Sequence, residues 1–374
     1  MGGAFSLGRI FGFQFRIHYS WFFIFVLITF SLSWQYFPYA YPGWSAPVYW
    51  LTGIATSLLF FTSVVAHELA HSLVGRANGI PVRSITLFIF GGVAHMTREA
   101  TRHGAEFKMA LAGPLASLAI GGLFFLLYLL LQGISEPVAA LAFWLAQINA
   151  VLAIFNLIPG FPLDGGRVLR SLLWRFSGNY QRATRIAVEV GRGVGYLFVA
   201  GGIVLMFFYP GSWFNGLWLA FIGLFLSYVA TTSYRQAKWQ AALQGIRVAD
   251  VMATTCPAVS PDMTISRVVQ DYISVSGHRC FLVAAGGELK GILTLRNIKS
   301  VDRKRWDAAS VGDAMTPSGR LKAVSPDEEV LSVLEQMEGH GISQMPVVSE
   351  GRITGLLDRE DVLKLLYTRS RLGI

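Results

Sequence analysis

The segment VVAHELAHSLVGR, at residues 64–76, places two histidines and a glutamate inside an otherwise apolar stretch. His67 and His71 are four residues apart, so on a helix both imidazoles lie on one face and can bind the same zinc ion. Glu68, one position further on, would lie next to the metal, where a carboxylate can act as a general base. Burying such groups for packing alone is expensive in lipid, at roughly 2.5 to 3.5 kcal/mol for a central charge. The segment therefore predicts a hydrolytic zinc site.

The HExxH segment supplies only two of the three protein ligands that a catalytic zinc site needs. The extension that provides a third histidine in the metzincin proteases is absent, because Val74 and Ala77 stand where a glycine and a histidine are required. The third ligand must therefore come from elsewhere in the chain. The candidates downstream are His95, Glu99, His103, Glu106 and Asp164.

Asp164 differs from the other candidates in its surroundings, FNLIPGFPLDGGR. Pro159 and Pro162 precede it, and Gly165 and Gly166 follow it. This pattern ends a helix and leaves the aspartate free to turn inward. An aspartate before two glycines is usually a turn residue. In a chain that also contains HExxH, we favour Asp164 as the third ligand.

The composition of the 374-residue chain is that of a membrane protein. Hydrophobic residues make up 53% of it and charged residues only 14%, unlike an ordinary soluble domain. The excess of 31 Lys and Arg over 22 Asp and Glu is expected to flank membrane spans rather than to bind nucleic acid. The first apolar stretch has no small-residue cleavage site, so we expect a retained span rather than a signal peptide. Two cysteines, Cys256 and Cys280, exclude a disulfide framework.

Long apolar stretches predict about six transmembrane helices, each able to cross a bilayer of about 30 Å. They cover roughly residues 17–37, 48–75, 106–132, 138–158, 193–209 and 214–233. The connecting segments FPYAYPGWSAP, QGISEP and YPGSWF contain no Lys or Arg, whereas the alternate connections are rich in arginine. By the positive-inside rule, we expect an integral protein of the cell membrane with both termini in the cytoplasm.

A β-prone run, SITLFIFGGVAHM, lies between the second and third predicted spans. It is rich in Ile, Leu and Phe, contains Gly91 and Gly92, and is too short to cross a bilayer. Non-helical backbone at membrane depth needs protein or a water-filled cavity to satisfy its polar groups. The run predicts a re-entrant or hairpin β element, although an interfacial loop fits the sequence equally well.

The composition turns polar after about residue 240, and an internal repeat follows. VADVM at 248 returns as VGDAM at 311, and KGILTLRNI at 290 returns as TGLLDREDV at 354. Each copy predicts a strand, a helix, two strands and a helix. We therefore expect a membrane domain over residues 1–240 and a tandem α/β module over 246–368. The two repeats of the module would cover about 246–305 and 309–368.

The repeat resembles a pair of cystathionine-β-synthase (CBS) domains, which associate face to face as one module. The resemblance implies a cytoplasmic module that can bind an adenine nucleotide and can bring two chains together as a homodimer. The positions that contact nucleotide in that family hold Thr294, Asn297, Asp358 and Asp361. Both sites depart from the family pattern, because Asn297 replaces an acidic residue and Asp358 replaces a hydroxyl residue. Nucleotide binding and a purely structural dimerisation role both stay open.

The membrane half resembles the site-2 protease family of intramembrane zinc metalloproteases, in its branch with C-terminal CBS domains. HExxH in one span carries the resemblance, together with Asn156, Pro159, Leu163, Asp164 and Gly165 at the end of a later span. The resemblance covers nearly the whole chain.

This resemblance implies one zinc ion per chain, with His67, His71 and Asp164 as ligands and Glu68 as catalytic acid and base. It implies that Asn156 assists near the reacting carbonyl. The family element that matches the β-prone run is a strand edge proposed to hold extended substrate. The predicted substrate-binding residues are accordingly Phe88, Ile89, Phe90, Gly91 and Gly92.

The predicted function is that of an intramembrane zinc endopeptidase acting in regulated intramembrane proteolysis. It would cleave single-span membrane proteins within or near their transmembrane segments and would be regulated through the CBS pair. The expected partners are these substrates, the lipid bilayer and a second copy of the chain, and not nucleic acid. Two alternatives are a CBS-regulated metal transporter, which has no use for a glutamate in the HExxH register, and a non-catalytic homologue.

Overall fold

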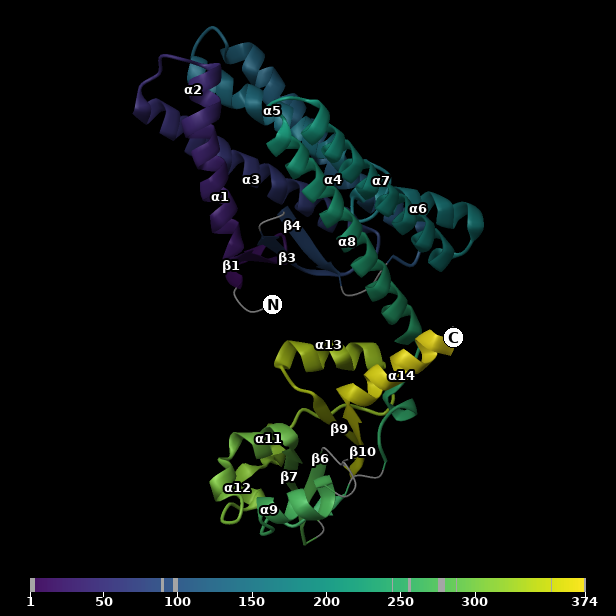
Figure 1. The fold of residues 1–374 in the computed structure, drawn as a ribbon. Coiled ribbons are helices and arrows are strands. Elements are labelled where there is room, and N and C mark those ends of the chain that lie inside the picture. The colour runs from purple at the N-terminus through teal and green to yellow at the C-terminus, as the bar shows by residue number, and fades with distance from the viewer. Residues whose placement is uncertain are drawn as a thin grey trace. The chain divides into compact units, whose positions relative to one another are not determined.

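The computed structural model describes residues 4–88, 91–96, 100–243, 245–254, 257–274, 280–286, 288–350 and 352–372. The chain forms two compact units, Met1–Arg235 and Gln236–Ile374, each with its own buried hydrophobic clusters. The first unit contains the predicted spans, and the second contains the repeat (Figure 1).

Within the described residues, six helical segments are long and apolar enough to cross a membrane, as the hydropathy predicts. The first combines α1 (Ser20–Ser31), the π-helical η1 (Leu32–Tyr36) and α2 (Phe37–Ala40). The others are α3 (Ala46–Ala77), α4 (His103–Leu131), α5 (Glu136–Asn156), α7 (Tyr180–Phe208) and α8 (Trp213–Leu243).

Two helical features differ from the hydropathy profile. The helix of the fifth span begins at Tyr180 rather than near residue 193. Its first turns are polar, so hydropathy does not include them in the span. Asn179 caps the helix by accepting a hydrogen bond from the Arg182 amide. A short amphipathic helix, α6 (Asp164–Ser177), precedes it and ends at Gly178, whose φ of 64° suits glycine. A hydropathy profile detects long apolar stretches, and therefore it identifies neither the polar turns of α7 nor α6.

A four-stranded sheet with the order β1-β2-β3-β4 packs against the HExxH helix α3. Its strands are β1 (Ala4–Ile10), β2 (Phe13–His18), β3 (Val82–Phe88) and β4 (Gly91–Met96). The β3–β4 hairpin confirms the predicted β element, whereas the two N-terminal strands were not predicted. Phe13, Phe15 and Ile85 pack against Leu69 and Leu73 of α3. Among the strands that the structure describes, β4 is the last in the order and so forms one edge of the sheet.

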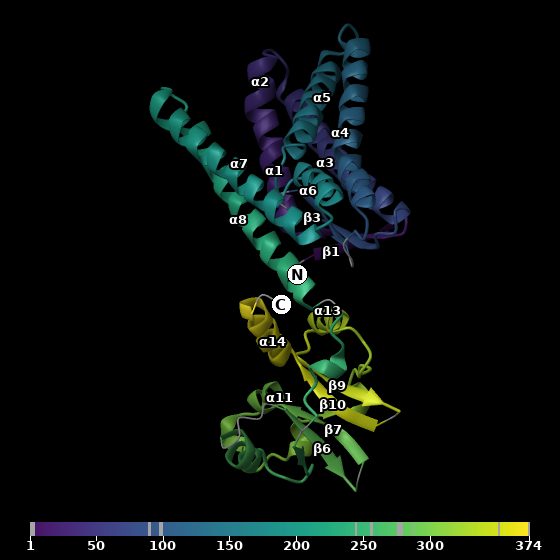
Figure 2. The same ribbon diagram turned by 90° about the vertical axis from the view of Figure 1, so that its right-hand side faces the viewer.

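The last two spans form a tight helical hairpin, which both views show as α7 and α8 running side by side (Figure 2). Glycines allow this close approach. A Cβ added to Gly195 would lie 2.7 Å from the Gly223 carbonyl oxygen, and one added to Gly202 would lie 2.6 Å from the Ala220 nitrogen. Such small-residue interfaces are the usual way for helices to pack closely in a membrane.

The second unit contains two copies of a strand hairpin followed by a helix. The first copy contains η2 (Val248–Asp250), β5 (Ala258–Val259), α9 (Ile265–Val268), η3 (Val269–Ile273), β6 (Cys280–Ala285), β7 (Glu288–Thr294), α11 (Leu295–Ser300) and η4 (Arg303–Arg305). The second contains α12 (Val311–Ala314), β8 (Thr316–Pro317), η5 (Ser318–Arg320), α13 (Val330–His340), β9 (Gln344–Ser349), β10 (Arg352–Asp358) and α14 (Arg359–Leu372). These elements confirm the predicted α/β pair.

Each repeat begins with a segment that packs onto the other repeat. Val248, at the start of the first, lies in the hydrophobic cluster of the second. Val311, at the start of the second, lies in the cluster of the first. This exchange buries apolar surface that neither repeat could bury alone, so the two repeats form one module.

Candidate metal centre

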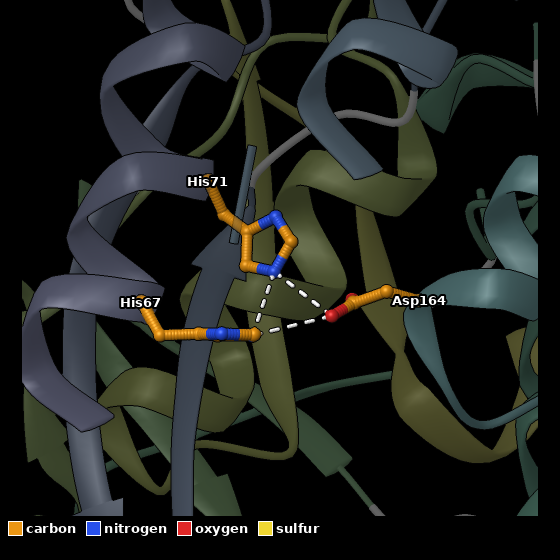
Figure 3. Close-up of side chains that lie close together, drawn as sticks. All are labelled: His67, His71 and Asp164. Carbon is orange, nitrogen blue, oxygen red and sulfur yellow. Dashed lines mark hydrogen bonds and ion pairs between the residues drawn. The ribbon is translucent and has the colours of Figure 1, made fainter. Parts of the chain in front are cut away.

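Three side chains that are distant in the sequence converge between α3 and α6 (Figure 3). His67 and His71 come from adjacent turns of α3, and Asp164 is the first residue of α6. The two Nε2 atoms are 3.2 Å apart, and Asp164 Oδ2 lies 3.2 Å from His67 Nε2 and 3.1 Å from His71 Nε2. Ligands of a tetrahedral zinc ion with bonds of about 2.05 Å lie about 3.3 Å apart. The donor set therefore has the spacing and chemistry of a zinc site.

Hydrogen bonds on the far side of each imidazole orient its Nε2 toward the cluster. The carbonyl oxygen of Met109 can only accept, so His71 Nδ1, 2.6 Å away, donates to it. With that proton on Nδ1, a neutral ring presents its unprotonated Nε2 to the cluster, as a metal ligand requires. His67 Nδ1 lies 2.9 Å from the hydroxyl of Ser117, which is fully buried. Both partners belong to α4, which thereby holds the two rings in place.

Gly113 of α4 provides the space that the two imidazoles occupy. A Cβ added there would overlap His71 Nε2 and would lie 2.6 Å from His67 Nε2. Any other residue at this position would push directly on both ligand atoms.

The LDGG turn places Asp164 by close backbone packing. A Cβ on Gly165 would lie 2.5 Å from the Leu157 carbonyl carbon, and one on Gly166 would overlap the backbone at Gly160. On the other side of the loop, a Cβ on Gly191 of α7 would lie 2.7 Å from the Phe161 nitrogen. The glycines thus let the loop after α5 fit between α6 and α7, and this position directs Asp164 toward α3.

The other candidate ligands occupy different positions. Glu106 forms a buried ion pair with Arg170, and the His103 ring packs at 6.1 Å against the Trp174 ring. Both are therefore occupied outside the cluster. The backbone of His95 pairs with Ser84 in the β3–β4 hairpin, but its side chain, like the whole of Glu99, lies outside the described part of the chain.

Glu68 lies against the edge strand. A Cβ on Gly92 would overlap Glu68 Cγ and would lie 2.9 Å from its Cδ, so β4 passes directly beside this carboxylate. Of the predicted substrate-binding residues, Phe88 ends the interior strand β3 and pairs with Gly91, whereas Gly91 and Gly92 begin β4. Ile89 and Phe90 lie outside the described residues. Asn156, at the end of α5, donates its side-chain amide to the Leu152 carbonyl of its own helix at 3.0 Å.

Replacing Gly92 with alanine should lower kcat by about 10- to 100-fold with the zinc content unchanged, because the three atoms nearest to the new methyl group all belong to Glu68. Steady-state cleavage kinetics and zinc analysis on the same samples would measure both effects. Gly104→Ala is the matched control, since a Cβ there meets nothing within 4 Å. Wild-type kcat in Gly92→Ala would mean that this contact does not set the position of Glu68.

The four predicted nucleotide-contacting residues lie at helix starts of the CBS module. Thr294 and Asn297 form a reciprocal cap at the start of α11, with the hydroxyl donating to Asn297 Oδ1 at 2.6 Å. Asp358 accepts from the Glu360 amide at 2.8 Å and from Gln344 Nε2 at 2.6 Å. Asp361 forms an ion pair with Lys364 at 2.9 Å.

Sequence reasoning did not identify Met109, Gly113 or Ser117, although all three fix the histidines. One signal was present: AGPLAS interrupts the third predicted span with Gly113, Pro114 and a serine. Glycine, proline and serine inside a span commonly mark a close helix contact or a freed backbone group.

Comparison with known proteins identifies the family of each half of the chain. Residues 55–141 and 133–198 match Peptidase family M50, and residues 248–304 and 311–368 match the CBS domain. The chain is 38% identical to the zinc metalloprotease Rip3 of Mycobacterium tuberculosis, over 98% of this chain and 93% of that protein. It is 35% identical to the zinc metalloprotease sll0528 of Synechocystis, over 98% of each chain. The solved site-2 protease of Methanocaldococcus jannaschii is 27% identical and matches 61% of this chain and 94% of its own, with a TM-score of 0.41.

The similarity to Rip3 and sll0528 runs through both the membrane helices and the CBS pair. In this chain the HExxH histidines meet an aspartate from a later helix, and the three ligand atoms have zinc-site spacing. The chain therefore belongs to the site-2 protease family, Peptidase family M50, and is an integral membrane zinc metalloprotease with tandem CBS domains.

Proposed function

We propose that the protein is an intramembrane endopeptidase that cleaves single-span membrane proteins within or near their transmembrane segments. The single observation that carries the proposal is that His67 and His71, next to Glu68 on the apolar helix α3, converge with Asp164 at the start of α6. A metal site of this composition at membrane depth is suited to hydrolysing peptide bonds that soluble proteases cannot reach.

The catalytic steps are assigned to residues of this chain. His67, His71 and Asp164 would hold the zinc ion, which when bound lowers the pKa of a coordinated water to about 7 and polarises a carbonyl. Glu68 takes a proton from the attacking water and returns it to the nitrogen of the leaving amine. Asn156 is proposed to lie near the reacting carbonyl, which would require its amide to release the Leu152 carbonyl that it contacts in this structure.

The edge of β4 is proposed to bind the substrate as an added strand. A transmembrane helix has its amides in internal hydrogen bonds, so the scissile segment must unwind before water can attack it. An exposed strand edge offers main-chain partners to the unwound segment, and it does so largely independently of side-chain sequence. Support comes from the position of β4 at the end of the sheet order and from the contact between Gly92 and Glu68. Because β3, which ends at Phe88, lies inside the sheet, we propose β4 and not β3 as the strand that the substrate pairs with.

We propose that both termini and the CBS pair lie in the cytoplasm of a cell whose plasma membrane holds the six spans. The arginine-rich connections, including α6 with Arg167, Arg170 and Arg175, would all face that side. The opposite connections lack Lys and Arg, and one of them carries the stacked rings of Tyr41 and Trp44, which are typical of a membrane interface. Water would then reach the zinc from the cytoplasmic side, where α6 begins.

The CBS pair is proposed to join two chains and to bind one adenine nucleotide, at the first repeat. Thr294 keeps the hydroxyl of the family pattern, whereas Asp358 replaces it with a carboxylate that would repel a phosphate. Calorimetry on the full-length protein with AMP should show one site per chain, weakened at least tenfold by Thr294→Val and unchanged by Asp358→Asn. Absence of binding to the wild type, or equal binding to Thr294→Val, would contradict the nucleotide site. The dimer is tested separately, by the mass of the protein in detergent.

The proteolytic proposal is tested by reconstituting the protein with a single-span test substrate and determining the product masses. We expect two fragments whose new ends lie within or next to the apolar span, and none after zinc is removed with a chelator. Cleavage only in a soluble loop would contradict the intramembrane assignment. Zinc movement across the vesicle membrane without any cleavage would favour the transporter alternative.

A further inference from the structure

A buried ion pair joins the helix that supports both histidines to the helix that carries the aspartate. Glu106 of α4 is fully buried, and Arg170 of α6 is 6% exposed. Arg170 Nε donates to Glu106 Oε1 at 2.7 Å, and Nη2 also contacts this oxygen. The guanidinium lies over two rings, with its carbon 4.8 Å from the centre of Phe161 and 4.7 Å from that of Tyr180. Arg170 thus contacts α4, the loop before α6 and the start of α7.

Two of the residues that Arg170 contacts, Glu106 and Phe161, lie within a few residues of groups at the metal site. Glu106 is one helical turn before Met109, whose carbonyl oxygen orients His71. Arg170 is on the helix that starts with Asp164, and Phe161 is three residues before that aspartate. The ion pair therefore fixes the distance between the α4 backbone, which holds the histidines, and the start of α6, which holds the third ligand.

We propose that Glu106 and Arg170 are a positioning pair that sets Asp164 at ligand distance from His67 and His71, and so controls zinc affinity. The proposal rests on the ligand assignment given under the proposed function. Groups that orient metal ligands typically change metal affinity 10- to 100-fold when removed. Neither residue needs to contact the metal or the substrate for this effect.

Breaking this pair has a large expected effect because it is buried. Removing one partner takes away the opposite charge that the other faces inside the protein, and the helices can respond by moving apart or by admitting water. An exposed pair behaves differently, because water solvates either partner alone. Glu189 and Arg192 on α7 form such a pair at 3.1 Å, with side chains 58% and 36% exposed, and so provide a control in the same protein.

The experiment measures zinc affinity by chelator competition, together with kcat and KM, for the full-length protein in detergent. In Glu106→Gln and Arg170→Lys we expect the zinc dissociation constant to rise 10- to 100-fold and kcat to fall at limiting zinc. KM should stay unchanged, and added zinc should restore part of kcat. Arg170→Lys keeps the charge but loses the planar contacts with both rings, so it should give the smaller effect. Glu189→Gln should match the wild type throughout.

The double variant Glu106→Gln/Arg170→Met guards against a folding failure, since removing both charges of a buried pair is often nearly neutral for stability. It should fold, by thermal unfolding, and still bind zinc weakly. Wild-type zinc affinity per folded chain in Arg170→Lys and in the double variant would overturn the proposal. If the variants bind zinc more weakly than the wild type but the wild type cleaves no substrate, the positioning role is supported and only the protease function is contradicted.

Discussion

Replacing Gly113 with alanine should empty the metal site and abolish proteolysis. The added methyl group would overlap His71 Nε2 and would lie 2.6 Å from His67 Nε2, so both ligand atoms must move. The rings cannot simply rotate away, because Met109 and Ser117 hold their other nitrogens from the same helix. We expect copurified zinc to fall to near zero and cleavage to drop by at least about 100-fold.

A matched control lies on the same helix. Gly122→Ala adds the same methyl group to α4 at a position where it meets nothing within 4 Å. Alanine favours a helix over glycine by about 1 kcal/mol, so both variants should keep their helical structure. Full zinc content in Gly113→Ala would show that the imidazoles can bind metal in another arrangement, and the ligand geometry described here would then be wrong.

Replacing Glu68 with glutamine should leave zinc bound and nearly eliminate the chemical step. The amide has nearly the same shape as the carboxylate but cannot accept the proton of the attacking water, and general-base catalysis typically contributes 10²- to 10⁴-fold. Because Glu68 is not among the three converging ligands, the zinc content should stay at the wild-type value. Substrate binding should also persist, so kcat falls while KM changes little.

Single-turnover cleavage and metal analysis on the same samples test this expectation. Glu68→Asp is a useful companion, since it keeps the base but withdraws it by one methylene and should recover part of the rate. Cleavage by Glu68→Gln at the wild-type rate would assign the base to another group. Loss of zinc in this variant would instead make Glu68 a ligand or a structural support.

The part of the site that lies within one helix could be predicted from the sequence. His67, Glu68 and His71 have fixed relative positions on any helix, so their spacing alone indicated their chemistry. Asp164 is 93 residues beyond His71. It was selected by its Pro and Gly neighbours and by family resemblance, and the structure brings it to the histidines. The glycine packing of the LDGG turn explains physically why this pattern marks the third ligand.

The parts that depend on how helices rotate against each other could not be predicted. Glu106 is an example, because its residue type made it a candidate ligand, and only the packing of α4 on α6 shows that it pairs with Arg170. The role of Gly113 likewise depends on which face of α4 meets the histidines. Strand β2 did carry a sequence signal in the alternation of Phe13, Phe15 and Ile17, but its parallel pairing with β3 joins segments about 70 residues apart.

The measurement that tests the central claim most directly is the zinc content and zinc-edge X-ray absorption spectrum of the wild type and of Asp164→Ala. The wild type should hold one zinc ion per chain with nitrogen and oxygen ligands at about 2.0 to 2.1 Å. Asp164→Ala should lose the zinc while His103→Ala keeps it, because the His103 ring packs against Trp174 outside the cluster. One zinc ion per chain in Asp164→Ala, with the wild-type spectrum, would place the third ligand elsewhere and contradict the site described here.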